Sequence, residues 1–477
     1  MGEAGPVTTQ TGSGTHSVLA QLQSSLAASV ERHGVPSASI AVRVGDRTYE
    51  AAAGWANRSA GIEATPGAIY HFGSTTKMLT ATLVVRLIDQ GLVDLDAPIA
   101  HYVPDFAPPD RSVAQRLTVR HCLTHQAGLT GIIFAETGCN DDTVARQIAL
   151  LNGAAQYHGP GAVLSYCNSG LILLGRLIEH ALGRPWHTAI VEDLAKPLGM
   201  NSVASRPEQA LRQRYAVGHV PDARDGRWTP DPHPYWMPGH GPAGSTCAGS
   251  ARDLLSLCAM HLQGGVSVDG TRFLSERMTR AMQELQVSSP ARLLNRGFGL
   301  GWVVYDWDGR RILGHDGSTA GSNSFLRVDP GRGMAVSLLV NCRRGMPVYE
   351  DLFREIFQGV SGTWEPEAPR AAAGAEEDLD RHVGTYEDCA IRVRVERSPH
   401  GLTMAVEPIV ATPLSKTLTQ RIELHPWAPG QFFVSGPDAM LGVPDAPPTT
   451  RLVRPYAVFE AEGTRWLHNG TSAFRRI

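Results

Sequence analysis

The stretch that decides the fold is STTKMLTATLVVRLI, residues 74–88. After Lys77 its side chains are apolar or small on almost every face, and Gly91 follows as a signal that ends a helix. A helix that is apolar all round is buried inside a large domain. We therefore predict a central helix with Ser74 at its start, where the positive end of the helix dipole lies.

Ser74 and Lys77 form the pattern Ser-x-x-Lys, which can supply a hydroxyl nucleophile and its base. Only three of the 43 Lys and Arg residues are lysines, and neither Lys196 nor Lys416 has a serine three positions earlier. A desolvated lysine can give up its proton, whereas an arginine in a protein cannot. The simpler alternative is that Ser74 only caps the helix, which is the commonest role of a serine at this position.

Length and composition indicate a globular protein with two domains. The chain has 477 residues, 42% of them hydrophobic and 19% charged. Its net charge of −3 offers no attraction to nucleic acid or to an anionic membrane surface, and we expect neither as a partner. The amino terminus does not resemble a signal peptide, and the seven scattered cysteines form no Cys-x-x-Cys pair. We expect a cytoplasmic protein without a metal or another cofactor.

The order of the expected elements indicates an α+β domain followed by a β domain. A helix is expected at 18–33, and strands at 38–44, 47–54, 299–305, 311–313, 324–328 and 334–340. Because strands lie on both sides of a helical middle, one sheet would be closed by distant parts of the chain. The predicted boundaries are a disordered amino terminus (1–14), the α+β domain (15–360), a linker (361–379) and a small antiparallel barrel or sandwich (380–477).

Two further short motifs fall in the first domain. Residues 166–168 (Tyr-Cys-Asn) come just before an apolar helix, and residues 314–318 (Gly-His-Asp-Gly-Ser) lie between two expected strands. Taken singly, burial would account for the tyrosine, and a hairpin turn would account for the Asp-Gly pair. Their order after Ser-x-x-Lys is what makes both motifs informative.

With these three motifs in order, the chain resembles the superfamily of serine β-lactamases and penicillin-binding proteins, nearest its class C and D-aminopeptidase/esterase branch. Further matching stretches are Phe72-Gly73, 123–129 (LTHQAGL), Pro160-Gly161, 197–200 (PLGM) and 242–245 (PAGS). The resemblance covers about residues 20–345, and residues 383–387 (VGTYE) resemble the lipocalin-like domain that some members append. It implies an antiparallel sheet flanked by helices, with a helical subdomain, followed by a lipocalin-like barrel.

The resemblance also implies roles for the motif residues. Ser74 is expected to attack a carbonyl group and form an acyl-enzyme, with Lys77 as its base. Tyr166 is expected to pass a proton to the leaving group, with its phenol pKa lowered by the charge of Lys77. Asn168 would orient Lys77 and the substrate amide. The backbone N–H groups of Ser74 and Ser318 would form the oxyanion hole.

The third motif departs from the usual pattern of the superfamily. Penicillin-binding proteins and class C β-lactamases usually carry Lys-Thr-Gly, whereas this chain has His315, Asp316 and Gly317. Near neutral pH His315 carries at most a partial charge, so it would hold a substrate carboxylate less firmly than a lysine. His-x-Gly resembles the esterases, D-aminopeptidases and acyl-transferring members. We expect His315 in the catalytic set and Gly317 in the oxyanion or substrate site, and we expect neither a penicillinase nor a cell-wall carboxypeptidase.

The expected activity is amide-forming acyl transfer through an acyl-enzyme. The chain resembles intracellular transacylases and free-standing peptide cyclases of natural-product pathways, including thioesterases of the penicillin-binding-protein type in antibiotic biosynthesis. This implies an acyl group, small or peptidyl, that is carried as an ester or a carrier-protein thioester and passed to an amine. Two alternatives stay open. One is hydrolysis by an esterase or a D-amino-acid peptidase or amidase, and the other is a binding or sensor protein that has lost catalysis.

Four aromatic residues are candidates for the substrate cleft. Trp236 and Trp302, together with Tyr235 and Phe134, are expected to line an apolar cleft. The alternative is that they belong to the core, which is where large aromatic side chains are more often found.

Two pairs of side chains could bind an anion or a metal, but each pair has a simpler explanation. Arg475 and Arg476 could bind a carboxylate or phosphate, but a solvated tail is the expectation. His121 and His125 have the spacing of a zinc pair, yet Cys122 stands where a zinc protease motif carries its catalytic Glu. We expect the two histidines to be structural.

Overall fold

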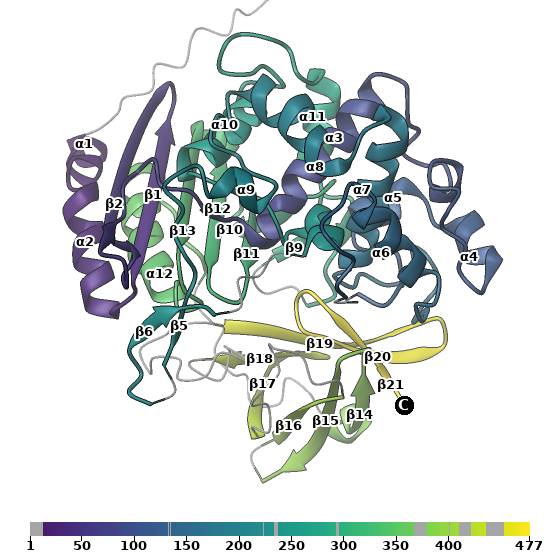
Figure 1. Ribbon diagram of the computed structural model, residues 1–477. Helices are drawn as coiled ribbons and strands as arrows, with labels where there is room; N and C mark the ends of the chain where they lie inside the picture. The colour runs from purple at the N-terminus through teal and green to yellow at the C-terminus, as the bar shows by residue number, and fades with distance from the viewer. Residues whose placement is uncertain are drawn as a thin grey trace, which may run out of the picture.

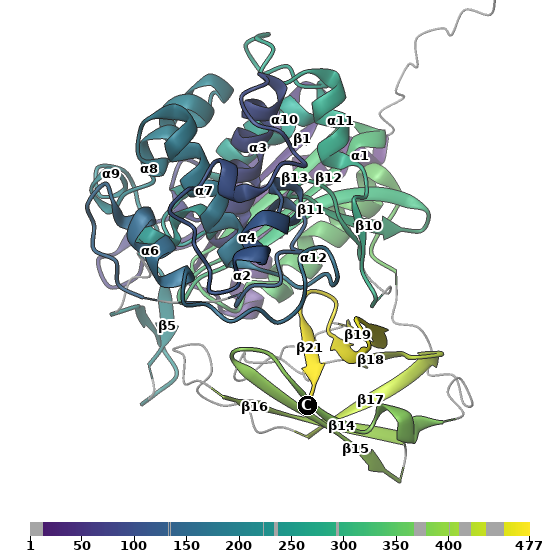
Figure 2. The ribbon, with the colours of Figure 1, turned by 90° about the vertical axis from the view of Figure 1, so that its right-hand side faces the viewer.

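The computed structural model describes residues 13–131, 133, 135–222, 224–232, 237–291, 295–366, 378–399, 401–409, 421–435 and 453–477. They form an α+β domain and a carboxyl-terminal β-barrel, which lies against one end of the first domain (Figures 1 and 2). Within these ranges no helix combines the length and the apolar character that crossing a membrane requires.

An antiparallel sheet forms the centre of the first domain. In the described part of the chain its order is β3-β2-β1-β13-β12-β11-β10-β9-β8. The strands are β1 (Ser37–Val44), β2 (Arg47–Asn57), β3 (Ile62–Glu63), β8 (Val287–Ser288), β9 (Asn295–Phe298), β10 (Val303–Trp307), β11 (Arg310–Ser318), β12 (Asn323–Asp329) and β13 (Met334–Val340). Ala38 pairs with Val340 and Val44 with Met334, so the first and last strands of the domain meet inside the sheet. This confirms the α+β fold closed by distant parts of the chain.

Helices cover both faces of this sheet (Figure 1). On one face lie α1 (Ser13–Ala20), α2 (Leu22–His33) and α12 (Met346–Ile356). On the other lie α3 (Thr76–Asp89) and α10 (Ala251–Leu262). Because side chains alternate along a strand, β1 contributes to the two separate apolar cores on the two faces.

The helical middle of the chain packs beside α3 and forms the other wall of the domain. Its members are α4 (Arg111–Arg116), α5 (Val119–Leu123), α6 (Thr143–Leu151), α7 (Asn168–Leu182), α8 (Trp186–Ala189), α9 (Pro207–Ala210), α11 (Glu276–Gln283) and the 3-10 turn η5 (Pro238–Ala243). Helices α5 and α7 and the turn η5 contribute residues to the same apolar core as α3 or contact it directly. Helix α3 is therefore enclosed by protein, as its apolar sequence predicts.

Two local predictions were wrong. The helix expected over 18–33 is broken at Gln21 into α1 and α2. Of the strand expected over 299–305, only residues 303–305 lie in a strand, because β9 ends at Phe298 and β10 begins at Val303. Gly301 stands in the corner between them with φ 88°, and an added Cβ there would lie 2.5 Å from Ala81 of α3. Close contact with α3 thus bends the chain where its composition suggests a straight strand.

The alternative explanation of the third motif, a hairpin turn, is also wrong. Residues 314–318 lie inside β11 and pair with β12, with His315 opposite Leu326 and Ser318 opposite Asn323. Their side chains therefore take fixed positions on the two faces of the sheet.

The carboxyl-terminal unit is a closed antiparallel barrel. Among its described residues the strands follow one another in chain order, and β21 pairs with β14 to close the ring. They are β14 (Gly384–Glu387), β15 (Ile391–Ser398), β16 (Gly401–Pro408), β17 (Arg421–Ala428), β18 (Gln431–Ser435), β19 (Val453–Ala461), β20 (Thr464–His468) and β21 (Ala473–Arg476). This up-and-down order is that of lipocalins. Arg475 and Arg476 are exposed on β21, in the barrel wall rather than in a loose tail.

The ends of the first domain differ in detail from the predicted boundaries. Helix α1 begins at Ser13, and residues 1–12 lie outside the described ranges. After α12 the chain stays on the first domain, because the Tyr349 hydroxyl donates a hydrogen bond of 2.5 Å to Glu365. Of the predicted linker, residues 367–377 lie outside the described part of the chain.

Candidate active site

Ser74 and Lys77 lie at the start of α3, within hydrogen-bond distance of each other. A 3-10 turn, η1 (Gly73–Thr75), precedes the helix, and neither η1 nor α3 is capped by a side chain, so the alternative that Ser74 serves as an N-cap is wrong. Ser74 is partly accessible, and its Oγ lies 3.0 Å from Nζ of Lys77. The serine is therefore free to react while its neighbour stays in contact with it.

Lys77 is buried, with 1% of its surface exposed. Its Nζ donates a hydrogen bond of 2.5 Å to the carbonyl oxygen of Ala243, which fixes the amine beside Ser74. Burial lowers the pKa of Lys77 well below its usual value, because the charged ammonium is disfavoured away from water. A neutral amine has a lone pair that can accept the Ser74 hydroxyl proton.

Tyr166 completes a compact group with these two residues. Its hydroxyl is hydrogen-bonded to Ser74, and Nζ of Lys77 lies 4.8 Å from the centroid of its ring. The expected lowering of the phenol pKa by Lys77 is wrong. Burial raises the pKa of Tyr166, and this effect outweighs the hydrogen bond to Ser74, which lowers it. The phenol therefore keeps its proton and can donate it.

His315 reaches the same group from β11. Its ring centroid is 6.3 Å from that of Tyr166. His315 Nδ1 lies 2.7 Å from the carbonyl oxygen of Asp316, so this nitrogen carries the proton and donates it. Burial, and then the nearby Lys77, lower the pKa of His315 to about 4. The imidazole is neutral at physiological pH, and its Nε2 is a buried acceptor without a hydrogen-bond partner among the described residues.

Asn168 is the first residue of α7, and the backbone places it beside the other motif residues. Its N–H donates to the carbonyl oxygen of Gly131 at 3.0 Å. Its Oδ1 is buried and has no hydrogen-bond partner in the described part of the protein. That Asn168 orients Lys77 stays a prediction. Like His315, it offers an acceptor that a bound ligand could use.

Two glycines let the end of β11 touch the turn that carries Ser74. A Cβ on Gly317 would lie 2.0 Å from the carbonyl oxygen of Phe72 and 2.9 Å from N of Ser74. A Cβ on Gly73, where φ is 54°, would lie 2.6 Å from N of Ser318. Only glycines permit this approach. These contacts bring the segments of Ser74 and Ser318 together, and that their backbone N–H groups form an oxyanion hole stays a prediction.

His125 was not among the expected catalytic or binding residues, yet it contacts the segment of Tyr166 through its ring and through two hydrogen bonds. Its ring stacks on Tyr166 at a centroid distance of 4.4 Å. Its carbonyl oxygen accepts from N of Ser165 at 2.9 Å, and its Nδ1 accepts from N of Cys167 at 3.1 Å. His125 takes a left-handed conformation, φ 59°, which is costly for a residue other than glycine. The sequence carries no signal for that strain beyond the family-like stretch in which His125 lies.

The other histidine of the zinc-like pair has a different role. His121 caps its own helix, α5, by accepting from N of Thr118 at 3.2 Å through Nδ1. In the ranges that the structure describes, no group of three or more His, Cys, Asp and Glu side chains could hold a metal ion.

Of the four aromatic residues predicted to line a cleft, only Trp302 lies in the described part of the chain, and the prediction for it was wrong. Trp302 is 0% exposed and belongs to the core, where its ring meets His261 of α10 edge-on at 5.1 Å. The corner at Gly301, between β9 and β10, turns Trp302 toward the core. Trp236, Tyr235 and Phe134 lie outside the described residues.

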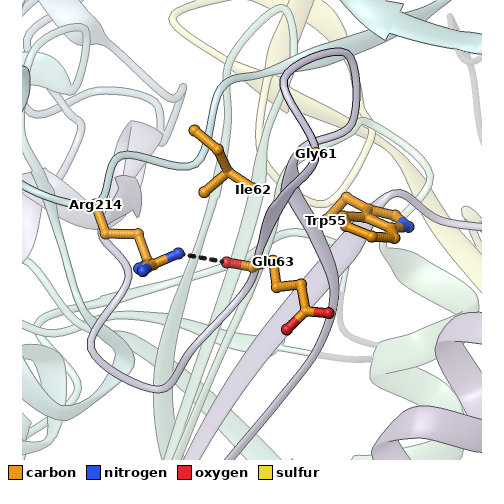
Figure 3. A pocket seen from close by; sticks show the side chains of 5 residues that line it. All are labelled: Trp55, Gly61, Ile62, Glu63 and Arg214. Carbon is orange, nitrogen blue, oxygen red and sulfur yellow. Dashed lines mark hydrogen bonds between the residues drawn. The ribbon is translucent and has the colours of Figure 1, made fainter.

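The surface hollow in Figure 3 is separate from this site. Trp55, Gly61, Ile62, Glu63 and Arg214 line it at the edge of the sheet, and Arg214 donates to the carbonyl oxygen of Glu63 at 3.1 Å. It contains none of the predicted catalytic residues.

The first prediction from this geometry concerns the nucleophile. A fluorophosphonate should add one label per chain, and peptide mass spectrometry should map it to Ser74, because its Oγ adjoins the buried amine of Lys77. Ser74→Ala should take no label. Ser256→Ala, a matched control on α10, should label at the wild-type rate. Labelling of Ser74→Ala at the wild-type rate would contradict the assignment.

The second prediction concerns Lys77 as a base. Lys77→Arg replaces the titratable amine with a permanently charged guanidinium, so acylation by an activated ester should fall at least ~10²-fold. Lys196→Arg, which alters an exposed ion pair with Glu192, should acylate normally. Since only the neutral amine accepts a proton, wild-type acylation should rise through the lowered pKa of Lys77 and level off well below pH ~10. A wild-type rate that still rises at that pH would show that the amine has an ordinary pKa.

Comparison with known proteins places the chain in a family. The beta-lactamase family profile matches residues 22–361. Penicillin-binding protein 4 of Amycolatopsis lactamdurans is 37% identical over 363 residues, which are 74% of this chain and 94% of that protein. Esterase EstB of Burkholderia gladioli is 29% identical over 353 residues, which are 65% of this chain and 87% of the esterase.

Solved structures extend the likeness to the barrel. SurE, solved with D-Leu, has a TM-score of 0.74 and 25% identity, and the match covers 98% of this chain and 100% of SurE. The D-amino acid amidase of Ochrobactrum anthropi, at 22% identity and a TM-score of 0.61, covers 73% of this chain and shares the fold of the first domain. Because the family profile spans well over half of its length, the chain belongs to the β-lactamase family, as a serine hydrolase or acyltransferase.

Proposed function

We propose that this protein is an amide-forming acyltransferase, which moves an acyl group from an ester or thioester to an amine through an acyl-enzyme on Ser74. The observation that carries the proposal is the pair of buried acceptors without partners among the described residues, His315 Nε2 and Asn168 Oδ1. A buried acceptor without a donor is costly, so a substrate that brings N–H groups would be favoured. A carboxylate, which brings only acceptors at neutral pH, would not be.

Acylation uses the buried Lys77 amine, whose pKa is lowered by burial, as its base. Its Nζ takes the hydroxyl proton as Ser74 Oγ attacks the carbonyl carbon of the donor. The N–H groups of Ser74 and Ser318 stabilise the negative oxygen of the tetrahedral intermediate. When the ester or thioester bond breaks, Tyr166 gives its proton to the leaving oxygen or sulfur and takes one from Lys77. The raised pKa of Tyr166 suits a donor that must be protonated before this step.

Aminolysis reverses the sequence with a different nucleophile. The neutral amine attacks the acyl-enzyme carbonyl, and its proton passes through Tyr166 and Lys77 back to Ser74 Oγ as the ester bond breaks. His315 Nε2 or Asn168 Oδ1 would accept an N–H hydrogen bond from the amine. This orients the amine for attack and gives it an advantage over water.

The comparisons support substrates of the amino-acid class. SurE was solved with D-Leu, and the amidase from Ochrobactrum anthropi was solved with D-phenylalanine. We therefore propose a peptidyl or aminoacyl donor, free or bound to a carrier protein, and a D-amino acid amide or peptide amine among the candidate acceptors. Free thiols are carried by Cys122, Cys139, Cys167, Cys247, Cys258 and Cys342, which fits the cytoplasmic location expected from the sequence.

Hydrolysis is the second candidate, and one observation favours it. Esterase EstB aligns with 65% of this chain, so water is the nucleophile in at least one relative whose name implies ester cleavage. Both activities use the same acyl-enzyme and differ only in what resolves it.

The third prediction separates the two activities. With an activated aminoacyl ester and a panel of L- and D-amino acid amides, the full-length protein should yield mainly amide by liquid chromatography and mass spectrometry. His315→Lys should lower the amide share, because an ammonium donor replaces the acceptor that orients the amine. Ser74→Ala measures the uncatalysed background. Hydrolysis alone across the whole panel would favour the esterase.

A further inference from the structure

The segment that carries Tyr166 belongs to no strand or helix of the first domain. Residues 164–167 are extended, and their backbone groups alternate between two sides. On one side, N of Ser165 and N of Cys167 donate to His125. On the other, N of Tyr166 donates to the carbonyl oxygen of Thr471, at 2.9 Å, in the turn between β20 and β21 of the barrel. The catalytic tyrosine thus stands between two domains.

Two more hydrogen bonds join the same turn to this segment. Nε2 of His468 lies 3.1 Å from the carbonyl oxygen of Leu164, and N of Ala473 donates to Oγ of Ser165 at 3.2 Å. His468 Nδ1 accepts from N of Gly470 at 3.0 Å, so Nε2 carries the proton and donates it to Leu164. The barrel therefore pairs with the Tyr166 segment much as an added strand would.

The turn is shaped by one side chain. Oδ1 of Asn469 accepts from N of Thr471 at 3.2 Å and from N of Ser472 at 2.8 Å. Asn is suited to this because its short side chain can bond to backbone N–H groups two and three residues ahead. Without that oxygen the turn loses the hydrogen bonds that hold the Thr471 carbonyl in place, although no group that touches the substrate changes.

An apolar contact holds the turn against the first domain. Val163, Trp466 and Ala473 form a buried cluster, and Trp466 meets the His158 ring edge-on at 5.8 Å. N of Gly159 donates to Glu462 at 3.1 Å on the same interface. In Figures 1 and 2 the strands nearest the first domain are accordingly the last ones of the barrel, drawn in yellow.

We propose that the β20–β21 turn of the barrel is a structural part of the active site, and that Asn469 and His468 are positioning residues that set the place of Tyr166. A displacement of the Tyr166 backbone moves its hydroxyl away from Ser74 and from the leaving group. The inference rests on the proposed role of Tyr166 in acylation and is independent of the choice between transfer and hydrolysis.

The test measures the rate at which an activated ester acylates Ser74 in the full-length protein. This step comes before an amine or water attacks the acyl-enzyme, so it does not depend on which of them does. In Asn469→Ala the acylation rate at saturation should fall about tenfold, with a small change in KM, because misplacement of a catalytic group lowers rate rather than binding. Asn469→Asp keeps an acceptor oxygen and should restore most of the rate. Asp269→Ala removes a similar turn-stabilising oxygen far from Tyr166, and it should acylate normally.

A double-mutant cycle decides whether the turn acts through Tyr166. In a Tyr166→Phe background, Asn469→Ala should lower the acylation rate by less than about twofold, since coupled residues give non-additive losses. Equal losses in both backgrounds, or failure of Asn469→Asp to restore the rate, would overturn the proposal. Wild-type acylation in Tyr166→Phe would overturn it together with the role of Tyr166, but would leave the acyl-enzyme on Ser74 untouched.

A second variant covers loss of folding. If the melting temperature shows that Asn469→Ala does not fold, His468→Ala takes its place in the same cycle, because it removes the hydrogen bond to Leu164. A folded His468→Ala protein should acylate more slowly than the wild type when Tyr166 is present. In the Tyr166→Phe background the same substitution should change the acylation rate little. A folded variant with wild-type acylation would contradict the inference.

Discussion

The burial of one amine governs the rest of this structure. Lys77 lies beside Ser74 inside a helix that is enclosed on every side, with its Nζ held by the Ala243 carbonyl oxygen. An ammonium is costly in such surroundings, so the pKa of Lys77 falls and the group becomes a base. The apolar helix, the packing of α7 and the turn η5 all serve to keep water from this nitrogen.

The same burial sets the state of the neighbouring groups. Burial raises the pKa of Tyr166, so the phenol keeps its proton. Burial also lowers the pKa of His315 to about 4, so the imidazole is neutral and presents an acceptor. A lysine at position 315 would present a cation instead. This buried group of side chains thus combines a base, a proton donor and an uncharged acceptor.

Backbone contacts bring the site together from five parts of the chain. Gly73 and Gly317 allow β11 to touch the turn of Ser74, while His125 and the β20–β21 turn hold the segment of Tyr166 from its two sides. The barrel is therefore packed against the catalytic machinery and is more than an appended module. Its last hairpin contributes to the wall in which the tyrosine stands, so the two domains are coupled through main-chain hydrogen bonds.

The sequence by itself determined the buried helix of residues 74–88, the order of the three motifs, the α+β fold and the barrel, because hydrophobic periodicity and motif spacing are local properties. It could not show that Trp302 turns into the core, that residues 314–318 lie within a strand, or that burial reverses the expected pKa shift of Tyr166. Nor could it reveal that His125 and the β20–β21 turn hold Tyr166. Only the tertiary structure decided these points, since desolvation and contacts between backbone groups far apart in the chain arise when the chain packs.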